Sequence, residues 1–279
     1  MNQSMFIVWR ESVEALLVIG ILQVWISRQT AHSRLGRFLW AGVVLGLFCS
    51  AGLAGLMLWA GEAMTGPQGE WLQAALTLLA SSLMVQMVFW MHRHAATLKH
   101  TLVREADERL ARQGGWGVLL LALLAVSREG SETVVFLYGA GARLQGPALN
   151  LFAIGGVLGL VLAGLTVLLL RSTRRFISWS LFFAFSEALL LLLGGALLVA
   201  AVDRISGQLL AMDMPEWVYS SFGESRWDSS ALLSDSHGLG ALLADFVGYR
   251  AAPSLVTVLV LLGYWLWVGN GLRRSRHAA

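Results

Sequence analysis

Long apolar runs recur along the whole chain and alternate with short polar connections. A helix of about 20 apolar residues spans a bilayer, because each residue adds about 1.5 Å and the hydrocarbon core is about 30 Å thick. Read with a window of about 19 residues, the runs fall at about 4–27, 38–60, 71–91, 116–140, 149–170, 179–202 and 252–270. This pattern predicts an all-α polytopic membrane protein with seven transmembrane helices that form a single domain over residues 1–279.

The composition favours a membrane protein over a soluble one. Of the 279 residues, 57% are hydrophobic and 13% are charged, and soluble domains carry about twice that charged fraction. We expect the first run to remain in the mature protein, since Arg10, Glu11 and Glu14 interrupt the purely apolar core that a signal peptide needs.

Two polar segments are long enough to have structure of their own. Residues 92–115 contain good helix formers with mixed charges and end in a glycine pair, which predicts a solvated connector helix. Residues 203–250 form the longest loop, with seven acidic residues that can concentrate cations. The alternative is a solvated loop without a binding role, whose acidity reflects only the side of the membrane on which it lies.

The basic residues predict the orientation of the chain. Fourteen of the 20 Lys and Arg residues fall on one set of alternating connections and four on the other. Because cytoplasmic connections are enriched in Lys and Arg, the N-terminus is predicted to lie outside and the C-terminus in the cytoplasm. The loop at 203–250 is then an outer loop.

The pattern Arg-Glu-x-x-Glu occurs in the first and the fourth predicted helix, 118 residues apart. Its charged residues are Arg10, Glu11, Glu14, Arg128, Glu129 and Glu132. At about 100° per residue the charged residues of one motif occupy one wedge of the helix surface, so both carboxylates face the same neighbour. The first helix runs inward and the fourth runs outward, so the repeat is inverted.

The inverted repeat divides the chain into parts. We expect repeat one at about 1–91, repeat two at about 116–202 and an additional last helix at about 251–272. Counted from the predicted outer edges, the four glutamates lie about seven to eleven residues deep, which is about 10–17 Å. Two antiparallel helices can thus present all four carboxylates to one point near the midplane, as in secondary transporters built from inverted repeats.

The energetic cost of these charges indicates a function. Each charged side chain at a helix centre costs about 2.5–3.5 kcal/mol, so six facing lipid would cost on the order of 15–20 kcal/mol. They must therefore compensate one another. A buried ion-pair network that only joins the two helices is the structural alternative, although single polar residues would join them at lower cost.

The donor set selects a class of cation. Four ionised glutamates and two arginines sum to a charge of −2, which a cation would neutralise. Oxygen ligands suit hard ions such as ferric iron, manganese, magnesium or calcium, and the motifs have no His or Cys neighbour that would favour copper or zinc. Crowded carboxylates also retain protons, so cation binding would release protons.

At these motifs the chain resembles the oxidase-dependent iron permeases, which include the bacterial EfeU type and the fungal high-affinity ferric permeases. Their hallmark is REGxE in helices 1 and 4. Residues 128–132 match it as REGSE, whereas Ser12 replaces the glycine in the first helix. The resemblance extends to FWM at 89–91, WDSSALLSDSHGLGALL at 227–243 and GYRAAPS at 248–254.

The resemblance implies uptake of ferric iron across the bacterial inner membrane. It implies that the two arginines, Arg10 and Arg128, support a set of iron ligands formed by Glu11, Glu14, Glu129 and Glu132. It also implies a periplasmic partner that oxidises or delivers iron. A glycine in place of Ser12 would permit nearer approach of the backbones at that point.

Four further residues are candidates for the path of iron. Glu187 lies in the sixth predicted helix, about eight residues from its inner edge. It is a candidate for an exit-side iron or proton site, and simple exposure to the cytoplasm is the alternative. Asp228, Asp235 and His237 in the outer loop are candidates for capturing iron, with loop structure or capping as the alternative.

Two other functions stay open. The first is transport of a different metal, such as ferrous iron or manganese, by the same carboxylates. The second is a non-transporting membrane subunit that senses iron or anchors a periplasmic redox partner. The long outer loop is the feature of the sequence that supports this second function. Enzymatic activity and a permanently bound cofactor are disfavoured because no matching motif is present, and the alternation of basic residues with spans disfavours nucleic-acid binding.

Overall fold

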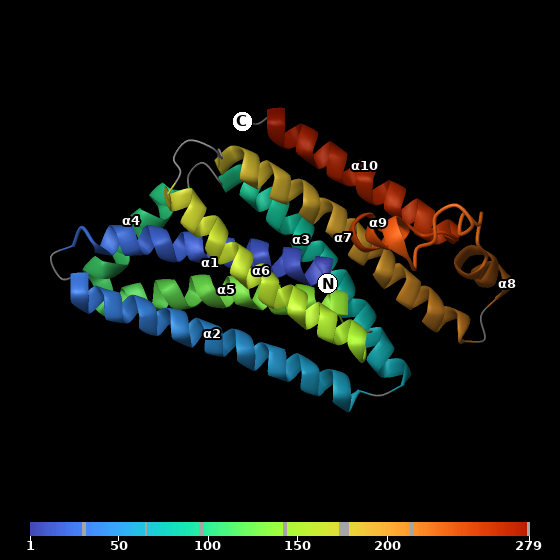
Figure 1. Cartoon of the computed structure of the whole chain (residues 1–279), viewed down its shortest axis with the longest axis horizontal. Coiled ribbons are helices and arrows are strands. Elements are labelled where there is room, and N and C mark those ends of the chain that lie inside the picture. The colour runs from blue at the N-terminus through green and yellow to red at the C-terminus, as the bar shows by residue number, and fades with distance from the viewer. Residues whose placement is uncertain are drawn as a thin grey trace. The chain divides into compact units, whose positions relative to one another are not determined.

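The computed structural model describes residues 1–29, 32–64, 66–94, 98–141, 144–172, 179–212 and 215–277 (Figure 1). Its longer helices are α1 (Asn2–Ile26), α2 (His32–Ala63), α3 (Pro67–His94), α4 (Leu98–Gln113), α5 (Gly115–Gly141), α6 (Pro147–Ser172), α7 (Trp179–Leu210) and α10 (Leu255–His277). Shorter elements between α7 and α10 are α8 (Glu216–Val218), the π-helical η1 (Tyr219–Gly223) and α9 (Gly238–Val247). The prediction of an all-helical chain is confirmed for these residues.

Each predicted transmembrane helix has a counterpart, in α1, α2, α3, α5, α6, α7 and α10. Within the described residues, five of these helices, namely α2, α3, α6, α7 and α10, are long and apolar enough to cross a membrane. Helices α1 and α5 are similarly long, with 25 and 27 residues, but each carries the three charges of one motif. The predicted connector helix is α4.

Proline and glycine account for several helix boundaries. Pro67 and Pro147 are the first residues of α3 and α6, where the missing N–H removes no helical hydrogen bond. Gly114, with a φ of 61°, separates α4 from α5, and Gly248, with a φ of 76°, ends α9. Both are in the left-handed conformation that glycine adopts without strain.

The chain divides into two compact units. The first contains Met1–Trp59, His94–Leu137 and Leu144–Ser178, and therefore α1, α4, α6 and most of α2 and α5. The second contains Ala60–Arg93, Tyr138–Arg143 and Trp179–Ala279, and therefore α7 to α10 and most of α3.

In the first unit, α1 and α5 run in opposite directions (Figure 1). The end of this unit near α4 is filled by apolar side chains from α1, α2, α4 and α5, with Leu22, Leu39, Ala106 and Val118 at most 1% exposed. The buried indole of Trp25 donates a hydrogen bond from Nε1 to Asp107 Oδ1 at 2.9 Å, which joins α1 to α4.

Glycine pairs bring two further helices close to α1 and α5. A Cβ at Gly42 or Gly46 of α2 would come too near Ala122 and Val126 of α5. A Cβ at Gly155 or Gly159 of α6 would come too near Ser4 and Val8 of α1. The contacted positions 4 and 122, like 8 and 126, are 118 residues apart, which is the separation of the two motifs.

In the second unit, α7 packs on α3 and α10. Ser81 Oγ of α3 donates to Gly194 O at 2.7 Å, and Tyr264 Oη of α10 donates to Leu191 O at 2.6 Å. Helix α7 ends at Leu210, eight residues beyond the predicted end at 202. The polar residues there are partnered, since Arg204 donates to Gln73 of α3 and Arg250 Nε lies 2.7 Å from Asp203 Oδ2, so the helix continues past them.

Candidate metal centre

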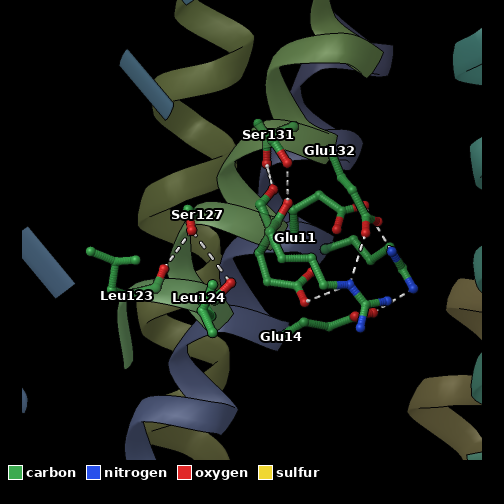
Figure 2. Close-up of polar contacts among 11 residues, drawn as sticks. Glu11, Glu14, Leu123, Leu124, Ser127, Ser131 and Glu132 are labelled. Carbon is green, nitrogen blue, oxygen red and sulfur yellow. Dashed lines mark hydrogen bonds and ion pairs between the residues drawn. The ribbon is translucent and has the colours of Figure 1, made fainter. Parts of the chain in front are cut away.

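The two Arg-Glu-x-x-Glu motifs lie in α1 and α5 of the first unit. Figure 2 shows the side chains of Glu11, Glu14 and Glu132 gathered on one side of these two helices. We call Glu11, Glu14, Glu129 and Glu132 the carboxylate centre. The sequence predicted that all four carboxylates would face one point, and the structure groups three of them, from Glu11, Glu14 and Glu129.

In the α1 half of the centre, one guanidinium holds both carboxylates. Arg10 Nη1 lies 2.7 Å from Glu11 Oε1, and Arg10 Nη2 forms a second ion pair with Glu14 Oε1. The side chains of Arg10 and Glu11 are each 1% exposed. Because separating such a buried pair would leave an uncompensated charge, this half of the centre is firmly held.

In the α5 half, the arrangement is looser. Arg128 Nε lies 3.1 Å from Glu132 Oε1 and 4.0 Å from Glu129 Oε1. The Arg128 side chain is 43% exposed, although the carboxylates of Glu129 and Glu132 are 11% and 15% exposed. The same sequence pattern therefore has a closed form in α1 and a partly open form in α5.

The carboxylates are near enough to share an ion. One oxygen each from Glu11, Glu14 and Glu129 lies within 4.8 Å of the other two, the one such cluster among the described residues. Oxygens that bind one ion at about 2.1–2.6 Å lie at most about 4–5 Å from each other. Three glutamates from two helices therefore have the spacing of a ligand set for a hard cation.

Several buried oxygens of the centre have no hydrogen-bond donor in the described part of the chain. They are Glu11 Oε2, Glu129 Oε2 and Glu132 Oε2. A buried acceptor without a donor costs about 1–3 kcal/mol, and more when it is charged. Arg10 and Arg128 already pair with other carboxylate oxygens of these glutamates. A cation or protons would therefore have to compensate the charge of the oxygens that have no donor.

The glycine of the second motif lies at a very close helix contact. A Cβ at Gly130 of α5 would overlap the Oγ and Cβ of Ser50 in α2. In α1 the equivalent of Gly130 is Ser12. The glycine pairs match Gly46 of α2 with Gly159 of α6, so the equivalent of Ser50 in α6 lies four residues later and is Ala163, which is fully buried. By this correspondence the α1 and α6 positions carry serine and alanine, where the α5 and α2 positions carry glycine and serine, so the smaller residue has changed sides.

Hydroxyl groups near the second motif bond to the carbonyls of their own helix. Ser131 Oγ donates to Arg128 O at 2.8 Å, and Thr133 Oγ1 donates to Glu129 O at 2.8 Å. Ser127 Oγ lies near the carbonyls of Leu123 and Leu124, as Figure 2 shows. Such bonds compete with the helical ladder and tend to bend helices.

Glu132 is not a member of this three-residue cluster, and the predicted entry and exit residues are not members either. Asp228 Oδ1 accepts the N–H of Ser230 at 2.9 Å, and hydrogen bonds from the Ser230 hydroxyl and backbone lower the pKa of this exposed carboxyl. Asp235 Oδ2 lies 3.4 Å from the N–H of Ala251. These contacts favour the structural alternative for the two aspartates, and iron capture stays a prediction.

His237 and Glu187 stay candidates without a test. His237 precedes α9, and its Nδ1 lies 2.6 Å from Ser236 Oγ. Glu187 lies half-buried in α7. The role of Gly42 and Gly46 in setting the distance between α2 and α5 was not predicted, although their four-residue spacing is a known signal for close helix packing.

Comparison with known proteins identifies the family. Residues 1–269 match the Iron permease FTR1 family. The chain belongs to this family of iron permeases. It is 28% identical over 262 residues to the ferrous iron permease EfeU of Escherichia coli O6:H1 (strain CFT073), which covers 92% of this chain and 90% of that protein.

A second relative of this permease gives the same result. The ferrous iron permease EfeU of Yersinia pestis is 26% identical over 268 residues, which covers 92% of this chain and 88% of that protein. No solved structure matches the permease. Together with its apolar helices, the family makes this chain a multi-pass transport protein of the inner membrane.

Proposed function

We propose that this permease moves ferric iron into the cytoplasm and that the carboxylate centre binds the ion during transport. The observation that carries this proposal is the set of buried oxygens on Glu11, Glu129 and Glu132 that have no donor within the described residues. Iron is the transported substrate here, so these groups must bind it and also release it.

The hard oxygen donors support the choice of ferric iron in this proposal. Carboxylate oxygens are hard ligands, and a small trivalent cation is attracted more strongly than a divalent one to a centre whose ionised charge is −2. Ferrous iron is the second candidate, because the relatives from Escherichia coli and Yersinia pestis are named ferrous iron permeases.

We propose that the chain has seven spans, an outer N-terminus and a cytoplasmic C-terminus, with an inverted repeat around the centre. The contacts of the glycine pairs support the repeat, since Gly42 and Gly155 meet positions of α5 and α1 that are 118 residues apart. In a permease of this kind the ion site lies between the two halves, near the midplane.

The same packing indicates what must move. The α4 end of the first unit is filled by buried apolar residues, including Leu22 and Val118. On the proposed orientation that end faces the cytoplasm, so the centre is closed on its inner side. Release of iron inward then requires α1 and α5 to separate at this end, and the hydroxyl bonds to the carbonyls of α5 favour bending of that helix.

The substrate is tested with purified permease in proteoliposomes. We expect uptake of radiolabelled iron from a ferric citrate solution, and weaker uptake of ferrous iron supplied without oxygen. Competition by manganese over iron would indicate a different metal transporter. A purified protein that reaches the bilayer but moves no iron, with or without a pH gradient, would favour a subunit that senses iron or anchors a periplasmic oxidase.

A further inference from the structure

Helix α9 is short, apolar and exposed on one side. Its ten residues, Gly238–Val247, extend over about 15 Å, or half of the hydrocarbon core, so this helix is too short to cross a membrane. Leu239, Leu242 and Leu243 are 73%, 40% and 40% exposed. At about 100° per residue these three positions fall within one stripe about 100° wide, which we call the leucine face. Asp245, the one charged residue of α9, falls outside this stripe.

The end of α9 packs against α7, which lies beside it in the second unit (Figure 1). A Cβ at Gly248 would lie 3.1 Å from Ala196 Cα and 3.3 Å from Gly195 O, so the two backbones are in close contact. Farther along α7, Asp203 Oδ1 lies 3.5 Å from Thr257 Oγ1, near the start of α10. Ala196 precedes Asp203 by seven residues. Helix α9 therefore ends about 10 Å deeper along α7 than the level at which α10 begins.

This depth places the end of α9 beside the apolar part of α7. The stretch of α7 that can cross a membrane is Ala184–Leu210, and Ala196 lies well inside it. An apolar helix of about ten residues is typical of a re-entrant or interfacial segment. Over the same depth α10 exposes Leu259 and Leu262, which are 58% and 56% exposed. The second unit therefore presents apolar side chains from two helices at one level.

The segment between α9 and α10 has the backbone partners that such a depth requires. Non-helical backbone is tolerated at membrane depth only where protein groups satisfy it. Ser229 N donates to Ala251 O at 2.9 Å, Arg226 N donates to Pro253 O at 3.0 Å, and both acceptor residues are buried. Trp227, between the two donors, is 52% exposed. An exposed tryptophan just before a spanning helix is typical of the membrane–water boundary.

We infer that the leucine face of α9 inserts among the lipid acyl chains of the outer leaflet and holds the outer loop on the bilayer. The choice of leaflet rests on the orientation proposed above. Lipid is the occupant because α9 ends at the depth of the apolar part of α7, where exposed leucines meet acyl chains. The polar segment before α9 then stays at the surface of the membrane.

Nitroxide labels measure this contact directly. Leu239→Cys and Leu242→Cys are introduced after native Cys49 is replaced by serine. The labelled permeases are reconstituted in vesicles of phosphatidylethanolamine and phosphatidylglycerol. Power saturation then compares molecular oxygen, which concentrates among acyl chains, with a nickel chelate, which stays in water. We expect oxygen to relax both labels severalfold more effectively than the nickel chelate.

Two further labels calibrate this result. Native Cys49 is exposed on the apolar helix α2 and serves as the lipid-facing reference. Ser230→Cys lies at an exposed position before α9, where the nickel chelate should be the stronger relaxing agent. Labels on the leucine face that resemble Ser230→Cys would overturn the inference, because that face would then lie in water. Labels that neither reagent reaches would also overturn it, because a second copy of the chain would then cover the face.

A charge on the leucine face gives a second test. Leu239→Asp should release α9 from the bilayer, so proteinase K added to spheroplasts should cleave residues 224–238 severalfold faster than in the wild type. Leu239→Phe keeps an apolar side chain and should match the wild type. Ala231→Asp adds the same charge at an exposed position outside α9 and should also match it. Equal cleavage of Leu239→Asp and Ala231→Asp would overturn the inference.

The same proteins separate this inference from the proposals on which it depends. Cleavage of residues 224–238 only in inverted vesicles would overturn the outer leaflet and the proposed orientation together. The nitroxide measurement needs no transport, so lipid contact by the leucine face in a permease that moves no iron would overturn the proposed function alone.

Discussion

Gly130 lies so close to Ser50 that no side chain fits between them. This contact fixes the separation of α5 from α2 within the second motif, between Glu129 and Glu132. Gly46 makes a similar contact one turn earlier, against Val126. The position of two of the four carboxylates therefore depends on small residues that have no ligand role.

The first prediction concerns Gly130→Ala. The added methyl group would overlap Ser50, and overpacking of this kind costs about 1–3 kcal/mol. We expect a lower melting temperature in detergent and reduced iron uptake. The matched control is Gly52→Ala in α2, where a Cβ meets nothing within 4 Å. Ser50→Gly should rescue Gly130→Ala, and a substituted protein as stable as the wild type would contradict the contact.

The second prediction concerns the corresponding contact of α6 with α1. Gly159→Ala would bring a methyl group against Val8 and the backbone of α1, so we expect destabilisation similar to that of Gly46→Ala in α2. Gly164→Ala on α6 is the control, since its Cβ meets nothing within 4 Å. Thermal melting of the four proteins measures the effect. Unequal costs at positions 46 and 159 would argue against an internal repeat.

Much of the fold could be predicted from the sequence, because hydropathy and helical periodicity are local properties. The long helices α1, α2, α3, α5, α6, α7 and α10 and the common face of Glu11 and Glu14 follow from them directly. The end of α7 could not be predicted, because Asp203 and Arg204 look like loop residues until Arg250 and Gln73 partner them. Such partners are distant in the sequence.

The difference between the two motif arginines was also invisible in the sequence. The patterns around Arg10 and Arg128 are nearly identical, and only the packing of neighbouring helices makes one buried and the other partly exposed. Likewise, Ser12 taken alone suggests weaker packing, whereas the repeat correspondence matches it with the small residue Ala163 of α6. Close packing is a property of pairs of residues, and one member of a pair does not determine it.

The third prediction concerns the joint between α1 and α4. Asp107→Ala leaves the buried Trp25 N–H without its acceptor, which costs about 1–3 kcal/mol. Asp107→Asn keeps an acceptor oxygen and should be close to the wild type. Glu108→Ala, at a neighbouring exposed position of α4, is the control. Melting temperatures distinguish the three, and equal values for Asp107→Ala and Asp107→Asn would exclude a role for this hydrogen bond.

The fourth prediction concerns the outer loop. Arg250 Nε binds Asp203 Oδ2 at 2.7 Å and joins the segment before α10 to α7. Arg250→Gln should loosen residues 224–238, and protease added to the outside of spheroplasts should cleave them severalfold faster than in the wild type. Cleavage only in inverted vesicles would contradict the proposed orientation, and unchanged cleavage would exclude the ion pair as a restraint.

The central claim is that the glutamates of both motifs bind iron during transport. The most direct measurement is uptake of radiolabelled ferric iron into proteoliposomes by Glu14→Gln and Glu132→Gln, at equal amounts of folded protein. Each substitution keeps the shape and removes the charge, and Glu108→Gln does the same on the exposed face of α4. We predict background uptake for the first two proteins and wild-type uptake for the third. Wild-type uptake by both Glu14→Gln and Glu132→Gln would contradict the assignment of these ligands.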